Sequence, residues 1–193
     1  MCQWLLKVNH GENGAFLKRT ATLLACAAIG GSGLAQGQKQ SGGHAHGHAH
    51  AHGVGQLQMV IDGPLLRGEL HIPMESLLGH EYLPRSQAQK NAMAQLRQSL
   101  VHSAYVIVPA ATAQCQATDS LATSPMFEGR DGGGHSSLLY AFAFRCEQPQ
   151  HLRKIDFPLF AKHPRLKEIQ VELVASAVQR SLRIKAAQPQ LVW

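Results

Sequence analysis

Hydrophobic and polar residues alternate along two neighbouring stretches of the chain, residues 56–61 and residues 65–72. A period of two places every second side chain on the same face, so each stretch is predicted to be a strand with one buried face. The turn residues Asp62-Gly63-Pro64 separate the two stretches, which predicts a hairpin. Pro73 is expected to end the second strand, because proline cannot donate a ladder hydrogen bond.

A longer period appears further along the chain. Apolar residues recur at every fourth position from Ala88 to Leu100, which predicts an amphipathic helix beginning at Ser86. Further strands are expected at residues 105–108, around Cys115, and at residues 138–146, 152–157, 169–173 and 178–184, with a short helical turn at residues 159–163. Antiparallel connections around one principal helix predict an α+β fold that is mainly an antiparallel sheet.

The composition divides the chain into regions. Residues 36–53 are rich in glycine, glutamine and histidine and hold no large apolar residue that could anchor them to a core, which predicts a flexible arm. The folded domain is expected to span residues 54–187, and a short tail is expected at residues 188–193. Within the domain, the polar stretch 119–134 ends in three glycines and is expected to be a loop.

Residues 1–35 have the features of an export signal. Lys18-Arg19 supplies a positive flank, the run from Thr20 to Gly33 is apolar, and Gly33-Leu34-Ala35 offers small residues for cleavage. The run is shorter than the ~20 residues of a transmembrane helix. The mature protein is therefore expected in the periplasm, with membrane contact only through the cleaved signal. A buried helix of the domain and lipidation at Cys26 are the alternatives.

Charge and cysteine content narrow the classes of function. The 193-residue chain has a formal net charge of +6, but its basic residues form no cluster, so nucleic-acid binding is not indicated. Cys115 and Cys146 remain after cleavage of the signal, and an even number of cysteines in an oxidising compartment favours a disulfide. A pair of thiolate metal ligands is the alternative.

Histidine is the anomaly in the composition. Of 12 histidines, five alternate with alanine and glycine, namely His44, His46, His48, His50 and His52. Residues two apart in an extended chain point the same way, so a slight bend lets several imidazoles converge on one ion. Zinc takes four ligands of this kind, so the tract predicts a metal site with interchangeable binding modes. A polar linker or a cloning remnant is the alternative.

The spacing of the tract does not select the metal. Imidazole also binds copper and nickel, and copper(II) generally binds such ligands more tightly than zinc does. Imidazoles titrate near pH 6.5, so protons are expected to displace the metal as the medium becomes acidic.

The predicted domain contains weaker ligand candidates. Glu69 and His71 share one face of a strand, and either residue of the pair His80-Glu81, after a turn at Gly79, could supply a third ligand. His135 beside the glycine loop is a further candidate. Each of them is also compatible with an ordinary surface residue. No set of residues typical of a catalytic site stands out, so the chain is not expected to be an enzyme.

Several motifs follow one another in a distinctive order. They are His52-Gly53-Val54-Gly55-Gln56-Leu57, Asp62-Gly63, Leu77-Leu78-Gly79-His80-Glu81-Tyr82-Leu83-Pro84, Cys115, Tyr140-Ala141-Phe142-Ala143-Phe144-Arg145-Cys146 and Leu159-Phe160. This ordered set resembles the ZrgA-like proteins, which proteobacteria export, and the resemblance spans residues 44–185. It implies periplasmic zinc binding linked to zinc uptake, which supplies the preference for zinc.

The sequence departs from that family at two places. The Gly-Phe-Glu-His segment of the family reads Gly79-His80-Glu81-Tyr82 here. Many relatives also carry a second insertion rich in histidine and aspartate between the two cysteines, whereas residues 116–134 contain no histidine. The metal capacity is therefore expected to be concentrated in the arm.

Three hypotheses follow from these observations. The leading one is a periplasmic zinc-binding accessory protein that buffers zinc or passes it to an uptake system, with a zinc ABC-transporter component as its partner. The second is a copper- or nickel-handling protein. The third is a non-catalytic envelope interaction module.

Overall fold

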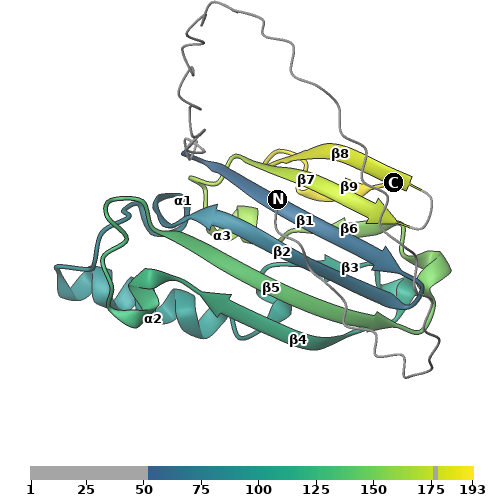
Figure 1. Ribbon diagram of the computed structural model, residues 1–193, viewed down its shortest axis with the longest axis horizontal. Helices are drawn as coiled ribbons and strands as arrows, with labels where there is room; N and C mark the ends of the chain where they lie inside the picture. The colour runs from purple at the N-terminus through teal and green to yellow at the C-terminus, as the bar shows by residue number, and fades with distance from the viewer. Residues whose placement is uncertain (1–51, 176–177) are drawn as a thin grey trace, which may run out of the picture. The chain divides into compact units, whose positions relative to one another are not determined.

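Six strands form the main sheet of the computed structural model, which describes residues 52–175 and 178–193 (Figure 1). The strands are β1 (Val54–Asp62), β2 (Leu65–Pro73), β4 (Cys115–Thr123), β5 (Ser137–Cys146), β7 (Glu168–Ala175) and β8 (Val178–Lys185). Their order across the sheet is β4-β5-β2-β1-β7-β8. All neighbours are antiparallel except β1 and β7, which run parallel.

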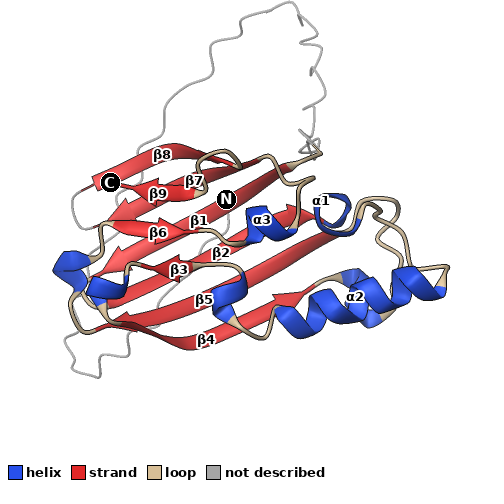
Figure 2. Ribbon diagram, turned by 180° about the vertical axis from the view of Figure 1, so that it is seen from behind, coloured by secondary structure: helices blue, strands red, loops and turns tan. Residues whose placement is uncertain are grey.

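A second layer covers one face of this sheet (Figure 2). It contains a three-stranded sheet of order β3-β6-β9. The strands are β3 (Val108–Pro109), β6 (Lys154–Asp156) and β9 (Gln190–Val192), and the helices are α1 (Met74–Leu78), α2 (Gln87–Ser99), α3 (Leu159–Lys162) and four 3₁₀ turns at residues 103–105, 111–113, 125–128 and 149–151. The predicted α+β class with a mainly antiparallel sheet is confirmed.

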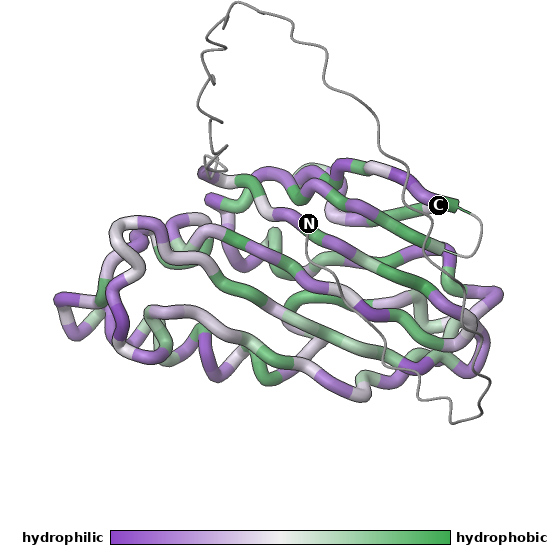
Figure 3. The backbone as a smooth tube through the Cα atoms, viewed as in Figure 1, coloured by the Kyte–Doolittle hydropathy of each residue, from purple (hydrophilic) through white to green (hydrophobic). Residues whose placement is uncertain are grey.

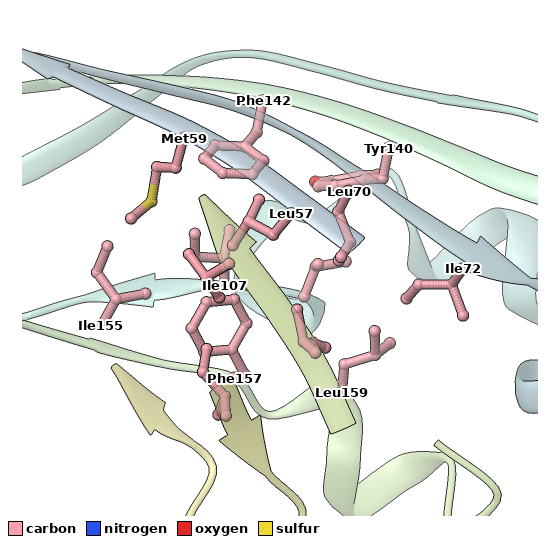
Figure 4. Packing of buried hydrophobic residues seen from close by; sticks show 14 of the residues in the cluster. Leu57, Met59, Leu70, Ile72, Ile107, Tyr140, Phe142, Ile155, Phe157 and Leu159 are labelled. Atoms are coloured by element: carbon pink, nitrogen blue, oxygen red, sulfur yellow. The ribbon is translucent and has the colours of Figure 1, made fainter. Parts of the chain in front are cut away.

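The core lies between the two layers. Figure 4 shows Leu57, Met59, Leu70, Ile72, Tyr140 and Phe142 of the main sheet near Ile107, Ile155, Phe157 and Leu159 of the second layer. All ten are buried, and full burial of each such side chain stabilises the fold by about 1.5–3 kcal/mol. The other face of the main sheet carries exposed polar residues such as Gln58 and Glu69. The tube in Figure 3 accordingly alternates between hydrophobic and hydrophilic along β1 and β2.

The principal helix α2 begins where the four-residue period predicts. Ser86 is its N-cap, and its hydroxyl accepts a hydrogen bond from the Gln89 N–H at 3.2 Å. The Gln89 side chain accepts one from the Ser86 N–H at 3.1 Å, which completes a capping box. Leu96 is buried, whereas Ala92 is exposed, so packing uses the C-terminal half of the helix.

Cys115 and Cys146 form a disulfide that closes the β4–β5 pair. The two residues face each other directly in the antiparallel register. The predicted bridge is confirmed, and it withdraws both thiols from the set of metal ligands.

The prediction of a loop over residues 119–134 is wrong for residues 119–123. β4 continues to Thr123, and a 3₁₀ turn follows at residues 125–128. β4 is an edge strand with a bulge between Ala117 and Asp119, and most of its side chains are exposed. An exposed edge strand needs no alternation of apolar residues, so its sequence resembles that of a loop.

Two shorter elements also differ from the sequence-based expectation. Residues 188–193, expected to be a tail, contain β9, which pairs with β6 and buries Leu191. A strand of three residues is too short to show a period. Residues 105–108 contain the end of a 3₁₀ turn and the first residue of β3, so most of the strand expected there is absent. In residues 52–175 and 178–193, no helix has the length and apolar character needed to cross a bilayer.

Candidate metal site at the root of the histidine tract

The root of the histidine tract, defined here as His52 and Gly53, is fixed to the folded domain by its backbone. The Gly53 N–H donates to the hydroxyl of the buried Ser76 in α1 at 2.9 Å. The Gly53 carbonyl accepts from the backbone N–H groups of Lys167 and Glu168 at 2.8 and 3.1 Å. Three hydrogen bonds therefore hold the root between α1 and the start of β7.

The local geometry requires glycine at position 53. Its φ of +79° lies in the left-handed region, which side chains with a Cβ atom rarely adopt. A Cβ atom there would lie 2.9 Å from the carbonyl oxygen of Arg165, which is closer than normal contact. The absence of a side chain thus allows the root to pass against the Arg165 backbone.

His52 faces a carboxylate on α1. Its Nδ1 atom lies 3.3 Å from Oε2 of Glu75, and the other oxygen of Glu75 lies 3.7 Å from Nε of Arg165. The side chain of His52 is 68% exposed, against 26% for Glu75. The end of the tract therefore lies within ion-pair distance of a carboxylate of the folded domain.

A second pair of a glutamate and a histidine lies in the loops around α1 and β5. Oε2 of Glu81 lies 3.5 Å from Nδ1 of His135, so the structure brings together two of the predicted candidates. The neighbouring His80 is buried, with Nδ1 2.9 Å from the Tyr82 carbonyl oxygen and its ring stacked on the Tyr82 ring.

Glu69 and His71 lie on the exposed face of β2, as the alternation predicts. Their register partners on β1 are Gln58 and Gln56, and those on β5 are Ala141 and Leu139. In the described part of the chain, no group of three or more histidine, cysteine or acidic residues could hold a metal ion. The convergence of three such candidates on one ion is therefore not found there.

Several of the predicted features lie outside the described residues. The export signal, Cys26 and four histidines of the tract, His44, His46, His48 and His50, lie there. His52 is the histidine of the tract that lies within the described residues. Sequence reasoning missed Glu75 and Arg165, because nothing in the pattern around either residue signals that they meet the end of the tract.

Comparison with known proteins gives one positive result. No curated protein matches the chain. The family model described as the ZrgA family zinc uptake protein matches residues 49–193, which include the root, both cysteines of the disulfide and all the described strands. The chain therefore belongs to the ZrgA family of zinc uptake proteins.

Proposed function

We propose that this protein is a periplasmic accessory protein that captures zinc on the histidine tract and buffers it or passes it to an uptake system. Membership of a zinc uptake family is the observation that carries the proposal. The five alternating histidines supply the donors. The position of His52 at the root supports their use, because it places the end of the tract beside the folded domain.

The chemistry of the tract suits capture and release. Five imidazoles exceed the four ligands that one zinc ion takes, so ligands can exchange without full release of the ion. Such exchange favours transfer over permanent storage. The recipient that we propose is the periplasmic component of a zinc ABC transporter, and no catalytic step is required of this chain.

Calorimetric titration with zinc tests the proposal. The variant replaces the five histidines of the tract by glutamine and retains Gly53, so the hydrogen bonds of the root are preserved. A matched control replaces His102 and His151, which are exposed residues of the described domain. We expect the tract variant to lose zinc binding and the control to retain it. Equal stoichiometry in the two variants would contradict the role of the tract.

Metal competition separates zinc from copper and nickel. The proposal expects protein recovered from zinc-limited cells to carry zinc, and deletion of the gene to impair growth under zinc limitation. A growth defect confined to copper or nickel excess would favour the second hypothesis instead.

A further inference from the structure

The edge of the main sheet at β8 is open in the part of the chain that the structure describes (Figure 1). β8 pairs with β7 on one side, and among the described strands none pairs with it on the other. We propose that this edge is a docking site for a partner protein, which adds an extended segment rich in carboxylates to the sheet as a further strand. The inference goes beyond the proposed function, because it concerns attachment of the folded domain and needs no metal.

The backbone of β8 offers hydrogen-bonding groups along this edge. Just beyond the end of β8, the Ala186 N–H donates to the Lys167 carbonyl at 2.9 Å. Because bonded pairs alternate in an antiparallel ladder, the backbone groups of the even-numbered residues of β8 face β7 and those of the odd-numbered residues face away from it. The N–H and C=O groups of Gln179, Ser181 and Arg183 therefore point along the open edge, where a further strand would bond them.

β8 lacks the features that commonly close an edge strand. Its 8 residues pair with β7 without a register shift, and they include no proline. The opposite edge strand, β4, differs, because a bulge between Ala117 and Asp119 interrupts its register. Of the two edges of the main sheet, β8 is thus the one whose regular backbone can accept a further strand.

The charge of β8 identifies the chemistry of the partner. The strand carries Arg180, Arg183 and Lys185 and no acidic residue. A second copy of this chain is therefore a poor occupant, because self-pairing would place two such strands side by side and like charges across a strand pair are destabilising. A strand that carries carboxylates has the complementary charge.

The neighbour that β8 already has shows how carboxylates would be received. On the polar face of the sheet, Nε of Arg183 lies 3.8 Å from Oε1 of Glu168, and the hydroxyl of Ser181 donates to Oε2 of Glu172 at 2.8 Å. Both glutamates belong to β7, so carboxylates of an adjacent strand already contact the side chains of β8. The Arg183 side chain remains 70% exposed, which leaves it accessible to a strand on the other side.

The core-facing side of β8 adds an apolar requirement. Ile184 on this side is buried, but Val178 is 40% exposed and Leu182 is partly exposed. Apolar side chains of an added strand would cover these two residues. Because successive side chains of a strand point to opposite faces, the segment that fits alternates apolar and acidic residues.

Binding of synthetic peptides to the full chain tests the proposal. The probe is a capped, fluorescein-labelled peptide as long as β8 in which valine alternates with glutamate, and its control has lysine in place of each glutamate. We expect fluorescence anisotropy to show binding of the glutamate peptide that weakens as salt is added. The lysine peptide is expected to bind about tenfold more weakly or not at all.

Charge reversal assigns the binding to β8. Arg183→Glu with Lys185→Glu is expected to weaken binding of the glutamate peptide about tenfold and to strengthen binding of the lysine peptide, because cross-strand attractions become repulsions. Arg67→Glu with Arg145→Glu is the matched control, since these exposed arginines lie in the central strands β2 and β5. The control variant should bind the glutamate peptide as the wild-type protein does.

Hydrogen exchange locates the bound peptide. In the free protein the amide hydrogens of Ser181 and Arg183 are expected to exchange faster than those of Arg180 and Leu182, which face β7. The bound glutamate peptide should slow the exchange of the first two. Ser181→Pro removes an outward donor and no bond to β7, so it should weaken binding while the thermal midpoint stays close to that of the wild-type protein.

Three results would overturn the proposal. They are equal binding of the two peptides, absence of binding included, a charge-reversed variant that binds the glutamate peptide as tightly as the control variant, and amides of Ser181 and Arg183 that are protected before any peptide is added. The last result would mean that another copy or a segment of the same chain already covers the edge. None of the three depends on zinc, so failure of the proposed function would be seen separately.

Discussion

The Nδ1 atom of His163 lies 3.0 Å from the carbonyl oxygen of Leu77, so a buried imidazole ties the segment after α3 to the end of α1. Its Nε2 atom lies 2.9 Å from the hydroxyl of Tyr105. A neutral imidazole satisfies both contacts, because Nδ1–H donates to the carbonyl and Nε2 accepts from the hydroxyl. His163 therefore helps to hold α1, the helix that carries Glu75, next to the segment that carries Arg165.

Unfolding free energy is expected to fall below about pH 6.5 because of His163. Burial is the main cause that lowers the pKa of His163 from its ordinary value of 6.5, and the charge of Lys162 acts the same way, against the hydrogen bond to Leu77. Between the lowered pKa and pH 6.5 the unfolded chain binds a proton that the folded chain does not. Stability is thus present above pH 6.5 and is lost as the pH falls toward the folded pKa.

Urea unfolding at pH 7.5 and pH 5.5 checks this expectation, with His163→Gln as the comparison. The wild-type protein should lose more stability between the two values than the variant does. Identical losses would show that the pH dependence has another source.

Removal of the disulfide is expected to lower the free energy of unfolding by about 3 kcal/mol, because the bridge closes a loop with a sequence separation of 31 and restricts the unfolded chain. The variant is Cys115→Ala with Cys146→Ala, measured by denaturant unfolding. A reductant should lower the stability of the wild-type protein and leave the variant unchanged. The variant should also retain zinc binding, because both sulfur atoms of Cys115 and Cys146 are in the bridge and neither is a free thiolate ligand.

Gly53→Ala is expected to destabilise the fold more than Gly63→Ala. Both glycines have positive φ, at +79° and +53°, but a Cβ atom at Gly63 meets nothing within 4 Å. The left-handed conformation alone costs about 1 kcal/mol for alanine. At Gly53 the approach to the Arg165 carbonyl is added, for a total of about 3 kcal/mol. Thermal or denaturant unfolding of the two variants gives the comparison. Equal losses of stability would mean that the Arg165 backbone moves away from the added methyl group at no cost in free energy.

The sequence predicts those parts of the fold in which one face is buried. In β1, β2 and β5 every second side chain enters the core, and the period of two reports that burial directly. The capping box of α2 is equally local, since Ser86 and Gln89 are three residues apart. The exposed edge strand β4 and the five-residue helix α1 leave no such signal. The parallel pairing of β1 with β7 joins residues more than one hundred apart, and no local pattern encodes it.

The candidate site, too, can be predicted only in part from the sequence. The histidine tract is visible because its donors are consecutive in the sequence. Its partner Glu75 is 23 residues from His52, and Arg165 is 90 residues further on, so only the folded chain brings them together. The contact between Glu81 and His135 likewise depends on two loops that meet after folding.

Position 68 on β2 is expected to tolerate alanine in place of glycine only when the side chain of its register partner, Phe142, is replaced by a smaller one. Gly68 faces Phe142 across the β2–β5 pair, and a Cβ atom would lie 2.6 Å from Cζ of that ring and 2.8 Å from the Gln58 carbonyl oxygen. Phe142 is 4% exposed, so the ring has little room to move away. Gly68→Ala is therefore expected to cost about 1–3 kcal/mol, as overpacking of a core does.

The double variant Gly68→Ala with Phe142→Leu separates the ring contact from the backbone contact. Leucine leaves the space that the tip of the phenylalanine ring occupies, so the alanine should cost less in that background than in the wild-type protein. Denaturant unfolding of the two single variants and the double variant gives the coupling energy. Strictly additive losses would assign the cost of the alanine to the Gln58 carbonyl, and the ring would then have no part in requiring glycine at this position.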